Sequence, residues 1–318
     1  MQAIVINQYG NATNLQPAVL EKPTPAAGQV LIRVAAAGLN PVDFHVRNGM
    51  LAGTDTHQLP LVLGWDASGV IEILGSGVQN WQVGDAVMVH TPISLQGTYS
   101  EYIVADASLL AAKPASLTLL QAAALPLAGL TAWQGMMVDG QLQAGQRVLI
   151  HNASGGVGSF AVQLAKAAGA HVTATASGRK RDLVLALGAD RFVDYTQAPF
   201  EQQLAAEEAF DLVFAATGGN DVLPRSLALI KRGGHLISTF DEMDEAQAQA
   251  AGVHYQRMWV HPDGAQLQEL GRLADEGKLK VVLDSVFPLA EVQAAHRHLE
   301  SQKVVGKSVL NIDPAIIA

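Results

Sequence analysis

The first 125 residues alternate short apolar runs with turn-forming residues. Apolar, β-branched runs occur at 30–35 (VLIRVA), 67–74 (ASGVIEIL) and 86–90 (AVMVH), and glycine, proline or aspartate bounds each of them. The pattern predicts short strands. Strands this closely punctuated are typical of a barrel or sandwich rather than of alternating strands and helices.

Beyond Pro114 the pattern changes. Residues 116–136 are rich in alanine and leucine, which predicts helix with a break at Pro126. From residue 147 apolar strands alternate with helices, and several strands, such as VLI and DLVF, are apolar throughout. Such strands are expected in a parallel sheet with helices on both faces. We expect strands at 147–151, 171–176, 192–194, 211–215, 234–239 and 253–260, and helices at 157–168 and 179–187.

The last part of the chain again shows the β-rich pattern of its beginning. A helix at 264–276, a segment at 281–287, a helix at 289–299 and a strand at 308–312 are expected there. The sequence therefore predicts an α/β chain in three parts. These are a β-rich domain at 1–125, a doubly wound domain at 126–262, and a return to the first domain at 263–318.

Composition narrows the class of protein. The 318 residues suggest about two domains of roughly 150 residues each. With 49% apolar and 15% charged residues the chain can bury a core, which excludes disorder. A net charge of −9 argues against nucleic acid or an anionic membrane as partner. Zero cysteines exclude a disulfide, a thiolate nucleophile and cysteine-ligated zinc. We see no secretory signal and no apolar run of about 20 residues, and we expect a cytoplasmic protein.

The strongest motif is a glycine-rich turn at 148–158, VLIHNASGGVG, between a predicted strand and a predicted helix. Compared with G-x-G-x-x-G, its three glycine positions hold Ala153, Gly155 and Gly158. Gly155 lets the backbone approach a pyrophosphate, and Gly158 lets the helix pack close to the strand. The helix N-terminus supplies free N–H groups for the anion. We interpret the motif as a dinucleotide site; a tight turn without a ligand is the alternative.

The next strand indicates which dinucleotide is bound. In NAD-binding chains a carboxylate near the end of this strand binds the ribose 2′-hydroxyl. Here the sequence reads ASGRKR at 176–181, with no carboxylate before Asp182. Ser177, Arg179 and Lys180 would instead offer donors and positive charge to a 2′-phosphate, which favours NADPH. The alternative is a basic start of a surface helix.

With these motifs the chain resembles the medium-chain dehydrogenase/reductase superfamily, in particular its zinc-independent quinone oxidoreductase (zeta-crystallin-like) branch. The resemblance covers nearly the full length. It implies that the first and last parts form a GroES-like catalytic domain, that the middle forms a Rossmann domain, and that the cofactor binds between them. The segments that carry it are 35–49 (AAAGLNPVDFHVRNG), 63–70 (LGWDASGV), 96–104 (QGTYSEYIV), 124–133 (ALPLAGLTAW), 151–158 and 306–310 (GKSVL).

Zinc-dependent relatives hold their metal at three positions that correspond to Asn40, Trp65 and Leu127 here. None of these side chains is a competent zinc ligand, and the single carboxylate of Asp66 does not hold zinc. We therefore expect no metal. Without a Lewis acid, simple alcohol oxidation is the less expected reaction.

The resemblance also implies site residues. Asn40 and Thr131 would lie at the nicotinamide end, and His45 stands where many quinone oxidoreductases have tyrosine, so that the proton donor stays open. We take Asn40, His45 and Thr131 as the candidate catalytic residues. Besides Asn40 and Thr131, the candidate cofactor-binding residues are Ser154, Gly155, Gly156, Val157, Ser177, Arg179, Lys180, Tyr195, Thr217, Ser238, Phe240 and Lys307.

Some of these residues have plainer interpretations. Asp43 and Arg47 are expected to be a structural pair that holds their loop, and His45 can be a surface histidine of that loop. Tyr195 either contacts the cofactor or covers the sheet edge. Trp65 is a wall of the substrate pocket or part of the core.

We expect an NADPH-dependent, zinc-independent reductase that transfers hydride to a quinone or an α,β-unsaturated carbonyl compound. The alternatives are a 2-alkenal or enoyl-thioester reductase, and a non-catalytic NADPH-binding sensor or structural protein. The expected partner is a small conjugated carbonyl substrate. The resemblance further implies a homodimer or homotetramer, built by joining nucleotide-domain sheets edge to edge.

Overall fold

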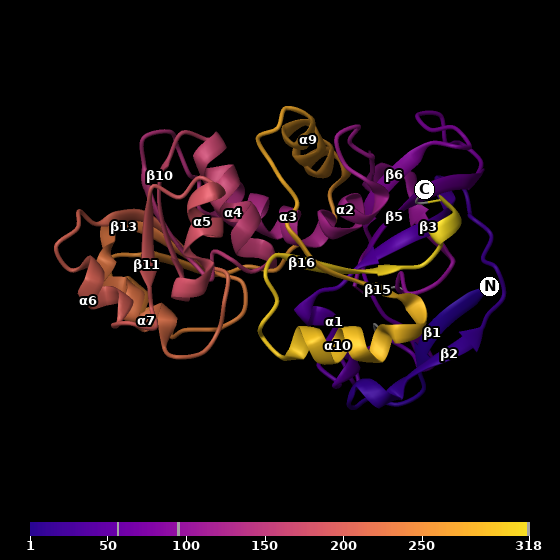
Figure 1. Ribbon diagram of the computed structural model, residues 1–318, viewed down its shortest axis with the longest axis horizontal. Helices are drawn as coiled ribbons and strands as arrows, with labels where there is room; N and C mark the ends of the chain where they lie inside the picture. Colours follow the sequence, from indigo (N-terminus) through magenta and orange to yellow (C-terminus); the bar gives the residue numbers. More distant parts are fainter. Residues whose placement is uncertain (56, 94–95, 317–318) are drawn as a thin grey trace. The chain divides into compact units, whose positions relative to one another are not determined.

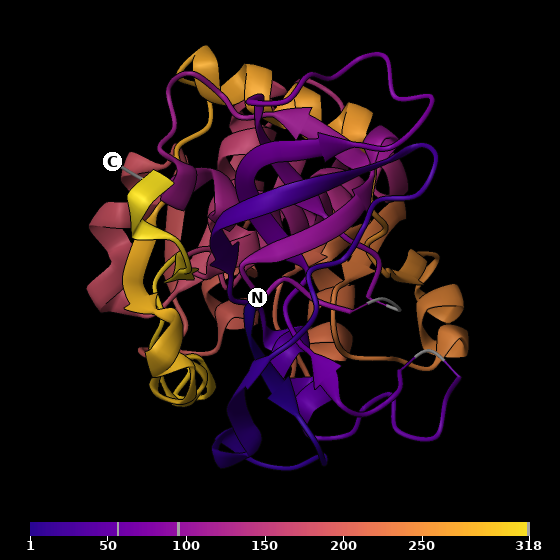
Figure 2. The ribbon, with the colours of Figure 1, turned by 90° about the vertical axis from the view of Figure 1, so that its right-hand side faces the viewer.

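The computed structural model describes residues 1–55, 57–93 and 96–316. The contacts within the chain divide it into two compact units. The first unit comprises Met1–Leu130, His261–Gly277 and Val281–Ala318, and the second comprises Thr131–Val260 with Lys278–Lys280. The beginning and the end of the chain therefore fold into the same unit, as the indigo and yellow ribbons show (Figures 1 and 2).

The first unit is built from two sheets. The smaller has the order β2-β1-β4, and the larger has the order β15-β16-β3-β5-β6-β8, with β7 also paired to β3. The strands are β1 (Gln2–Ile6), β2 (Leu15–Val19), β3 (Gln29–Gly38), β4 (Leu61–Val62), β5 (Asp66–Leu74), β6 (Ala86–His90), β7 (Tyr102–Asp106), β8 (Leu110–Ala112), β15 (Leu283–Pro288) and β16 (Lys307–Asn311).

Strand β3 organises the larger sheet. One of its edges pairs with β5, while the other is shared by β7 along residues 29–33 and by β16 along residues 36–38. Gly69 of β5 lies so close to β3 that a Cβ there would be 2.1 Å from the carbonyl oxygen of Arg33. Only glycine fits at that point. The chain's last strand, β16, thus joins the sheet to which β3, from the first 40 residues, also belongs.

The helices of this part of the chain are short. They are α1 (Pro41–Arg47), α2 (Leu119–Ala124), α3 (Pro126–Trp133), α9 (Gly264–Asp275) and α10 (Val292–Glu300). Helix α2 ends before Pro126 and α3 begins with it, which confirms the expected break. The helix expected up to residue 136 continues as a π-helix, Gln134–Asp139.

The second unit contains one parallel sheet of six strands in the order β11-β10-β9-β12-β13-β14. Counted from β9 this is the order 3-2-1-4-5-6, so the direction of winding reverses between β9 and β12. Open sheets of this kind bind ligands beyond the carboxyl ends of the strands at that reversal. The strands are β9 (Arg147–His151), β10 (His171–Ala176), β11 (Arg191–Asp194), β12 (Phe210–Ala215), β13 (Ile230–Ser238) and β14 (His254–Arg257).

Helices cover both faces of this sheet. Figure 1 shows α4 (Gly156–Ala167) and α5 (Arg181–Ala186) on one face, and α6 (Phe200–Leu204) and α7 (Val222–Ser226) on the other. The remaining helix, α8 (Glu245–Ala251), precedes β14. Residues at the strand centres, such as Leu149, Val213 and Leu236, are fully or almost fully buried. Two-sided cover explains why these strands read as apolar throughout.

Several expected elements differ in extent, among them two strands of the second unit. Strand β13 begins at Ile230 rather than at 234, and β14 is limited to His254–Arg257 rather than 253–260. No helix in the described ranges is long and apolar enough to cross a membrane.

Candidate functional site

The glycine-rich turn lies at the winding reversal of the second unit. Strand β9 ends at His151, and α4 begins at Gly156, after an N-cap at Gly155 that makes no side-chain capping hydrogen bond. The first N–H groups of α4 therefore have no capping side chain and suit an anion. The side chain of Asn152 donates to the carbonyl oxygen of Ala216 at 3.0 Å, which ties the turn to the chain after β12.

Gly158 has the packing role expected of it. A Cβ at this position would lie 2.1 Å from the carbonyl oxygen of Asn152. A larger residue would push α4 away from the turn. The turn is therefore built for close backbone approach, and its uncapped amides fit a pyrophosphate.

Other expected cofactor residues follow the carboxyl ends of neighbouring strands. Thr217 comes two residues after β12 ends, Ser238 is the last residue of β13, and Phe240 follows it. Ser238 is buried, and its hydroxyl donates to the carbonyl oxygen of Asp241 at 2.8 Å. Phe240 is 47% exposed. Thr131 is buried within α3. Because parallel strands end at one edge, Thr217 and Ser238 share that edge with the glycine-rich turn.

The basic loop after β10 has an acidic neighbour, Asp194, which the sequence pattern does not reveal. Ser177 precedes a short 3₁₀ helix, Gly178–Lys180, which contains Arg179. A Cβ at Gly178 would lie 2.3 Å from a carboxylate oxygen of Asp194, at the end of β11. Hydrogen bonds from Thr196, and one from the Gly178 backbone, lower the pKa of Asp194.

Asp194 therefore places a negative charge beside a loop expected to bind a phosphate. The Asp194 carboxylate and the basic loop are both in contact with solvent, which screens the negative charge of Asp194. Tyr195, the next residue, is 53% exposed. It is available on the surface next to the same loop.

A buried histidine, His151, lies at the end of β9, directly before the glycine-rich turn. His151 lies between the hydroxyls of Thr175 and Ser226, each 3.1 Å from one ring nitrogen, and its ring meets the edge of Phe200. Burial lowers its pKa to about 3, and Arg225 contributes to this shift. The ring is therefore neutral at physiological pH. The sequence did not indicate this buried position, because His151 is the last residue of an otherwise apolar strand run.

In the first unit, the carboxylate of Asp66 gathers residues from distant segments. It is fully buried and accepts hydrogen bonds from Asn40 Nδ2 at 2.8 Å and from the backbone N–H of Leu127 at 2.7 Å. The ammonium of Lys307 lies 3.8 Å away. Of the three positions that correspond to zinc ligands, Asn40 and Leu127 thus contact this carboxylate, whereas the ring of Trp65 stacks on His57.

The side chain of Asn40 is held at both of its polar atoms. Lys307 Nζ donates to Asn40 Oδ1 and, at 2.8 Å, to the carbonyl oxygen of Leu39, while Asn40 Nδ2 donates to Asp66. Burial lowers the pKa of Lys307, and the charges of Asp66 and Asp43 act in the opposite direction. The structure thus brings together Asn40 and Lys307, which the sequence placed more than 260 positions apart.

The expected pairing of Asp43 with Arg47 is wrong. Asp43 Oδ2 accepts from the hydroxyl of Tyr99 at 2.7 Å and from the backbone N–H of Asn40 at 2.8 Å. Burial raises the pKa of Asp43 to about 7, against the effect of these hydrogen bonds. The carboxyl group of Asp43 therefore holds the backbone before α1 and the side chain of Tyr99 in place.

Arg47 has a different set of partners. Its guanidinium binds Glu300 at 2.6 Å, His296 Nδ1 at 3.0 Å and the carbonyl oxygen of Gly10 at 2.9 Å. His296 Nε2 lies 3.3 Å from the Tyr99 hydroxyl, which in turn binds Asp43. Arg47 and Asp43 are therefore linked only indirectly, through His296 and Tyr99. Burial, followed by the charge of Arg47, lowers the pKa of His296 to about 3.

His45 lies on helix α1 and is half-buried, so its placement in a surface loop is wrong. Its ring centroid is 4.3 Å from that of Phe44, and burial lowers its pKa. Whether this ring takes part in chemistry stays a prediction.

The residues do not fit a zinc ion. Asn40, Trp65 and Leu127 supply no zinc ligand, and the sequence contains no cysteine. Within the described ranges, no group of three or more histidine, aspartate or glutamate side chains could hold a metal ion.

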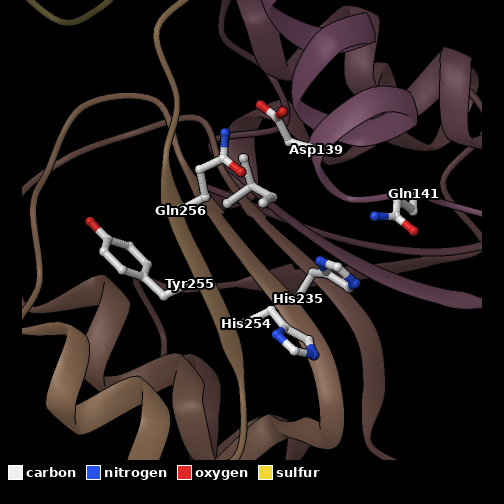
Figure 3. Close-up of a pocket in the computed structure, with 7 residues that line it drawn as sticks. Asp139, Gln141, His235, His254, Tyr255 and Gln256 are labelled. Carbon is white, nitrogen blue, oxygen red and sulfur yellow. The ribbon is translucent and has the colours of Figure 1, made fainter.

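A hollow of about 350 Å³ lies elsewhere on the second unit (Figure 3). His235 of β13 and His254 of β14 are partners in register there, with ring centroids 5.2 Å apart. No residue of the expected cofactor site lines this hollow, so we do not assign the cofactor to it. Its lining residues are Asp139, Gln141, His235, Ile237, His254, Tyr255 and Gln256.

Comparisons with known proteins agree with this architecture. Residues 26–115 match the alcohol dehydrogenase GroES-like domain family, and residues 187–310 match a family described as zinc-binding dehydrogenase. The chain is 35% identical to the mitochondrial NAD(P)H oxidoreductase RTN4IP1 of Mus musculus, over 98% of this chain and 89% of the relative. It is 36% identical to the chloroplastic NADPH-dependent alkenal/one oxidoreductase of Arabidopsis thaliana, over 98% of this chain and 79% of the relative.

The chain belongs to the medium-chain dehydrogenase/reductase superfamily.

Solved structures extend this finding to the branch. The quinone oxidoreductase of Coxiella burnetii superposes with a TM-score of 0.90 at 34% identity, covering 98% of this chain and 99% of that one. The Escherichia coli quinone oxidoreductase, solved with NADPH, gives 0.88 at 27% identity, covering 98% and 100%. The expected GroES-like and Rossmann folds and the zinc-lacking quinone oxidoreductase branch of the superfamily are confirmed.

The buried His151 makes stability depend on pH. Folded, the ring stays neutral down to about pH 3, whereas unfolded it takes up a proton near its ordinary value of 6.5. Stability is therefore lost as the pH falls below 6.5, by on the order of 1 kcal/mol per pH unit. Between pH 7 and 5, His151→Gln should lose about 2 kcal/mol less unfolding free energy than wild type in urea titrations. His171→Gln, at an exposed position on β10, is the control. Parallel pH curves for His151→Gln and wild type would contradict this account.

Proposed function

We propose that this protein is an NADPH-dependent, metal-free reductase that transfers hydride to a quinone or an α,β-unsaturated carbonyl compound. The observation that carries the proposal is the uncapped glycine-rich turn at the winding reversal of the second unit. Asn40, Trp65 and Leu127 of the first unit supply no zinc ligand, and this supports a conjugated acceptor. The names of the oxidoreductase relatives support both the nicotinamide cofactor and the conjugated acceptor.

The reaction divides its tasks between cofactor and protein. NADPH supplies the hydride when bound. In a conjugated acceptor the negative charge spreads onto an oxygen, where a hydrogen-bond donor stabilises it without a metal. The protein's residues therefore have to bind, orient and exclude water rather than coordinate an ion.

We assign the expected site residues accordingly. Asn40, fixed by Lys307 and Asp66, and Thr131 act at the nicotinamide end, and His45 stays a candidate proton donor. The assigned cofactor contacts are Ser154, Gly155, Gly156 and Val157 for the pyrophosphate, Ser177, Arg179, Lys180 and Tyr195 for the adenosine ribose and its 2′-phosphate, and Thr217, Ser238 and Phe240 for the nicotinamide ribose. The expected cytoplasmic location stays a prediction, since relatives carry mitochondrial and chloroplastic names.

The purified protein should oxidise NADPH in the presence of conjugated carbonyls. We expect turnover with at least one class among a benzoquinone, a cyclic enone, a 2-alkenal and an enoyl thioester, followed by the loss of absorbance of NADPH. A saturated ketone and a primary alcohol with NADP⁺ are the controls and should not react. Tight NADPH binding without turnover of any class would favour the non-catalytic alternative.

The cofactor preference depends on the basic loop. Arg179 and Lys180 would bind the 2′-phosphate, and charge-assisted hydrogen bonds contribute about 1.5–3 kcal/mol each, nearer the low end on an exposed loop. Replacing both by alanine should raise the KM for NADPH about 10- to 100-fold and leave that for NADH nearly unchanged. The turnover number should barely move, and Arg232→Ala, at an exposed position on β13, is the control. Equal use of NADH and NADPH by wild type at low ionic strength would contradict the assignment.

We propose further that two copies join through β14, which ends the sheet of the second unit. An exposed strand edge offers unpaired N–H and C=O groups to a second copy. Light scattering at micromolar concentration should give twice the 33.4 kDa of one chain, or four times for a tetramer. A mass equal to one chain would overturn this proposal.

A further inference from the structure

A carboxylate from the neighbouring strand contacts the basic loop after β10. Strands β10 and β11 run parallel, and their last residues, Ala176 and Asp194, are partners in register. Ser177, the residue after Ala176, therefore begins the loop beside Asp194. A Cβ at Gly178 would lie 2.3 Å from Asp194 Oδ2, so a side chain there would displace either the carboxylate or the loop. The close approach of loop and carboxylate thus depends on this glycine.

Both oxygens of the Asp194 carboxylate are engaged. Its Oδ1 accepts from the backbone N–H of Thr196 at 2.9 Å and from the Thr196 hydroxyl at 2.6 Å. Its Oδ2 faces Gly178, whose backbone N–H donates to the carboxylate, as does the side chain of Gln197. These hydrogen bonds, above all those from Thr196, lower the pKa of Asp194. The group is therefore ionised at physiological pH and offers acceptors only.

An ionised carboxylate cannot itself bind a phosphate. It has no proton to donate, and its charge has the same sign as that of the phosphate. The bond from Gly178 is what connects Asp194 with the residues proposed to bind the adenosine 2′-phosphate. Any favourable effect of Asp194 on the cofactor must therefore be exerted through the backbone of the loop.

The short 3₁₀ helix of the loop, Gly178–Lys180, is anchored from outside rather than by its own N-cap. An N-cap serine often accepts a backbone N–H of the helix that it precedes, but Ser177 makes no such bond. Its carbonyl oxygen accepts from the backbone N–H of Lys180 at 2.9 Å, and Asp194 accepts from that of Gly178. The Ser177 hydroxyl is thus not required for capping.

We propose that Asp194 is a positioning residue for the adenosine 2′-phosphate of NADPH. By fixing the backbone at Gly178, it holds the side chains of residues 177–180 in place for the phosphate. This inference rests on the proposed NADPH site and adds to it a residue from the neighbouring strand. A loop that is ordered before the cofactor arrives loses less conformational entropy on binding.

Asp194 has two effects on the phosphate, and they have opposite signs. Its charge repels the phosphate, but repulsion between solvent-exposed charges changes affinity by less than about fivefold. Ordering two long basic side chains, here Arg179 and Lys180, on binding costs on the order of tenfold in affinity. We therefore expect the ordering effect to dominate, so that removal of the carboxylate weakens the binding of NADPH.

The test uses two fragments of the cofactor and titration calorimetry with the full chain. Adenosine 2′,5′-bisphosphate and adenosine 5′-monophosphate differ only in the 2′-phosphate, and neither carries a nicotinamide. Wild type should bind the bisphosphate at least about tenfold more tightly. Asp194→Ala should weaken binding of the bisphosphate about tenfold and leave that of the monophosphate within about twofold. Unchanged binding of the monophosphate also shows that the variant is folded.

A matched control removes a carboxylate from the opposite end of the same strand. Asp190 directly precedes β11, and its carboxylate accepts from the backbone N–H of Val172 at the start of β10. Asp190→Ala changes the net charge as Asp194→Ala does and also removes a carboxylate bound to the β10 backbone. It should leave the affinities for both fragments unchanged.

Two further variants separate positioning from charge. Gly178→Ala should weaken bisphosphate binding about as much as Asp194→Ala, because its Cβ forces the loop and the carboxylate apart. The double variant should bind no more weakly than either single variant, since both substitutions break the same contact. Asp194→Asn keeps one acceptor and loses the charge, so its affinity should lie between those of wild type and Asp194→Ala. Bisphosphate binding by Asp194→Asn that is tighter than in wild type would overturn the inference.

The outcomes distinguish this inference from the proposed function. If wild type prefers the bisphosphate but Asp194→Ala keeps that preference, or loses affinity for both fragments equally, the inference is wrong and the NADPH site stands. A wild type that binds both fragments equally overturns the NADPH assignment and the inference with it. A bisphosphate-specific loss in a protein that reduces no conjugated carbonyl supports the role of Asp194 and overturns the reductase assignment.

Discussion

The buried carboxylate of Asp66 is the constraint on which the first unit depends. A charge removed from water is costly unless donors surround it, and here they come from three distant segments. Asn40 stands before α1, the backbone N–H of Leu127 belongs to α3, and Lys307 begins the last strand. Satisfying one carboxylate therefore brings the beginning, the middle and the end of the chain together. The same bonds fix the orientation of the Asn40 carboxamide.

This arrangement also explains the kind of chemistry that we propose. At the positions that correspond to zinc ligands the chain has an amide, an indole and an aliphatic side chain, none of which binds zinc. Without a Lewis acid at these positions, the proposed acceptor is one whose oxygen shares its negative charge with a conjugated system. The second unit supplies the complementary part, a turn whose uncapped amides suit a pyrophosphate.

The sequence was sufficient where local pattern determines structure. The strands at 147–151 and 171–176 and the glycine-rich turn follow from apolar runs and from glycines that close packing requires. It was insufficient where partners come from other elements. Asp43 and Arg47 were expected to form a pair, but folding gives each of them a partner from a remote segment, Tyr99 for Asp43 and Glu300 for Arg47. Asp194 was missed beside the basic loop because it ends the neighbouring strand and becomes adjacent only in the sheet.

The most direct test of the account follows the hydride itself. Enzyme treated with a strong chelator would be supplied with NADPH deuterated at both C4 positions and with 2-cyclohexen-1-one. Mass spectrometry and NMR of the product should show cyclohexanone with one deuterium at carbon 3, formed at the rate of untreated enzyme. A product without deuterium, or a reaction that stops on chelation and returns with added zinc, would contradict metal-free hydride transfer to a conjugated carbonyl.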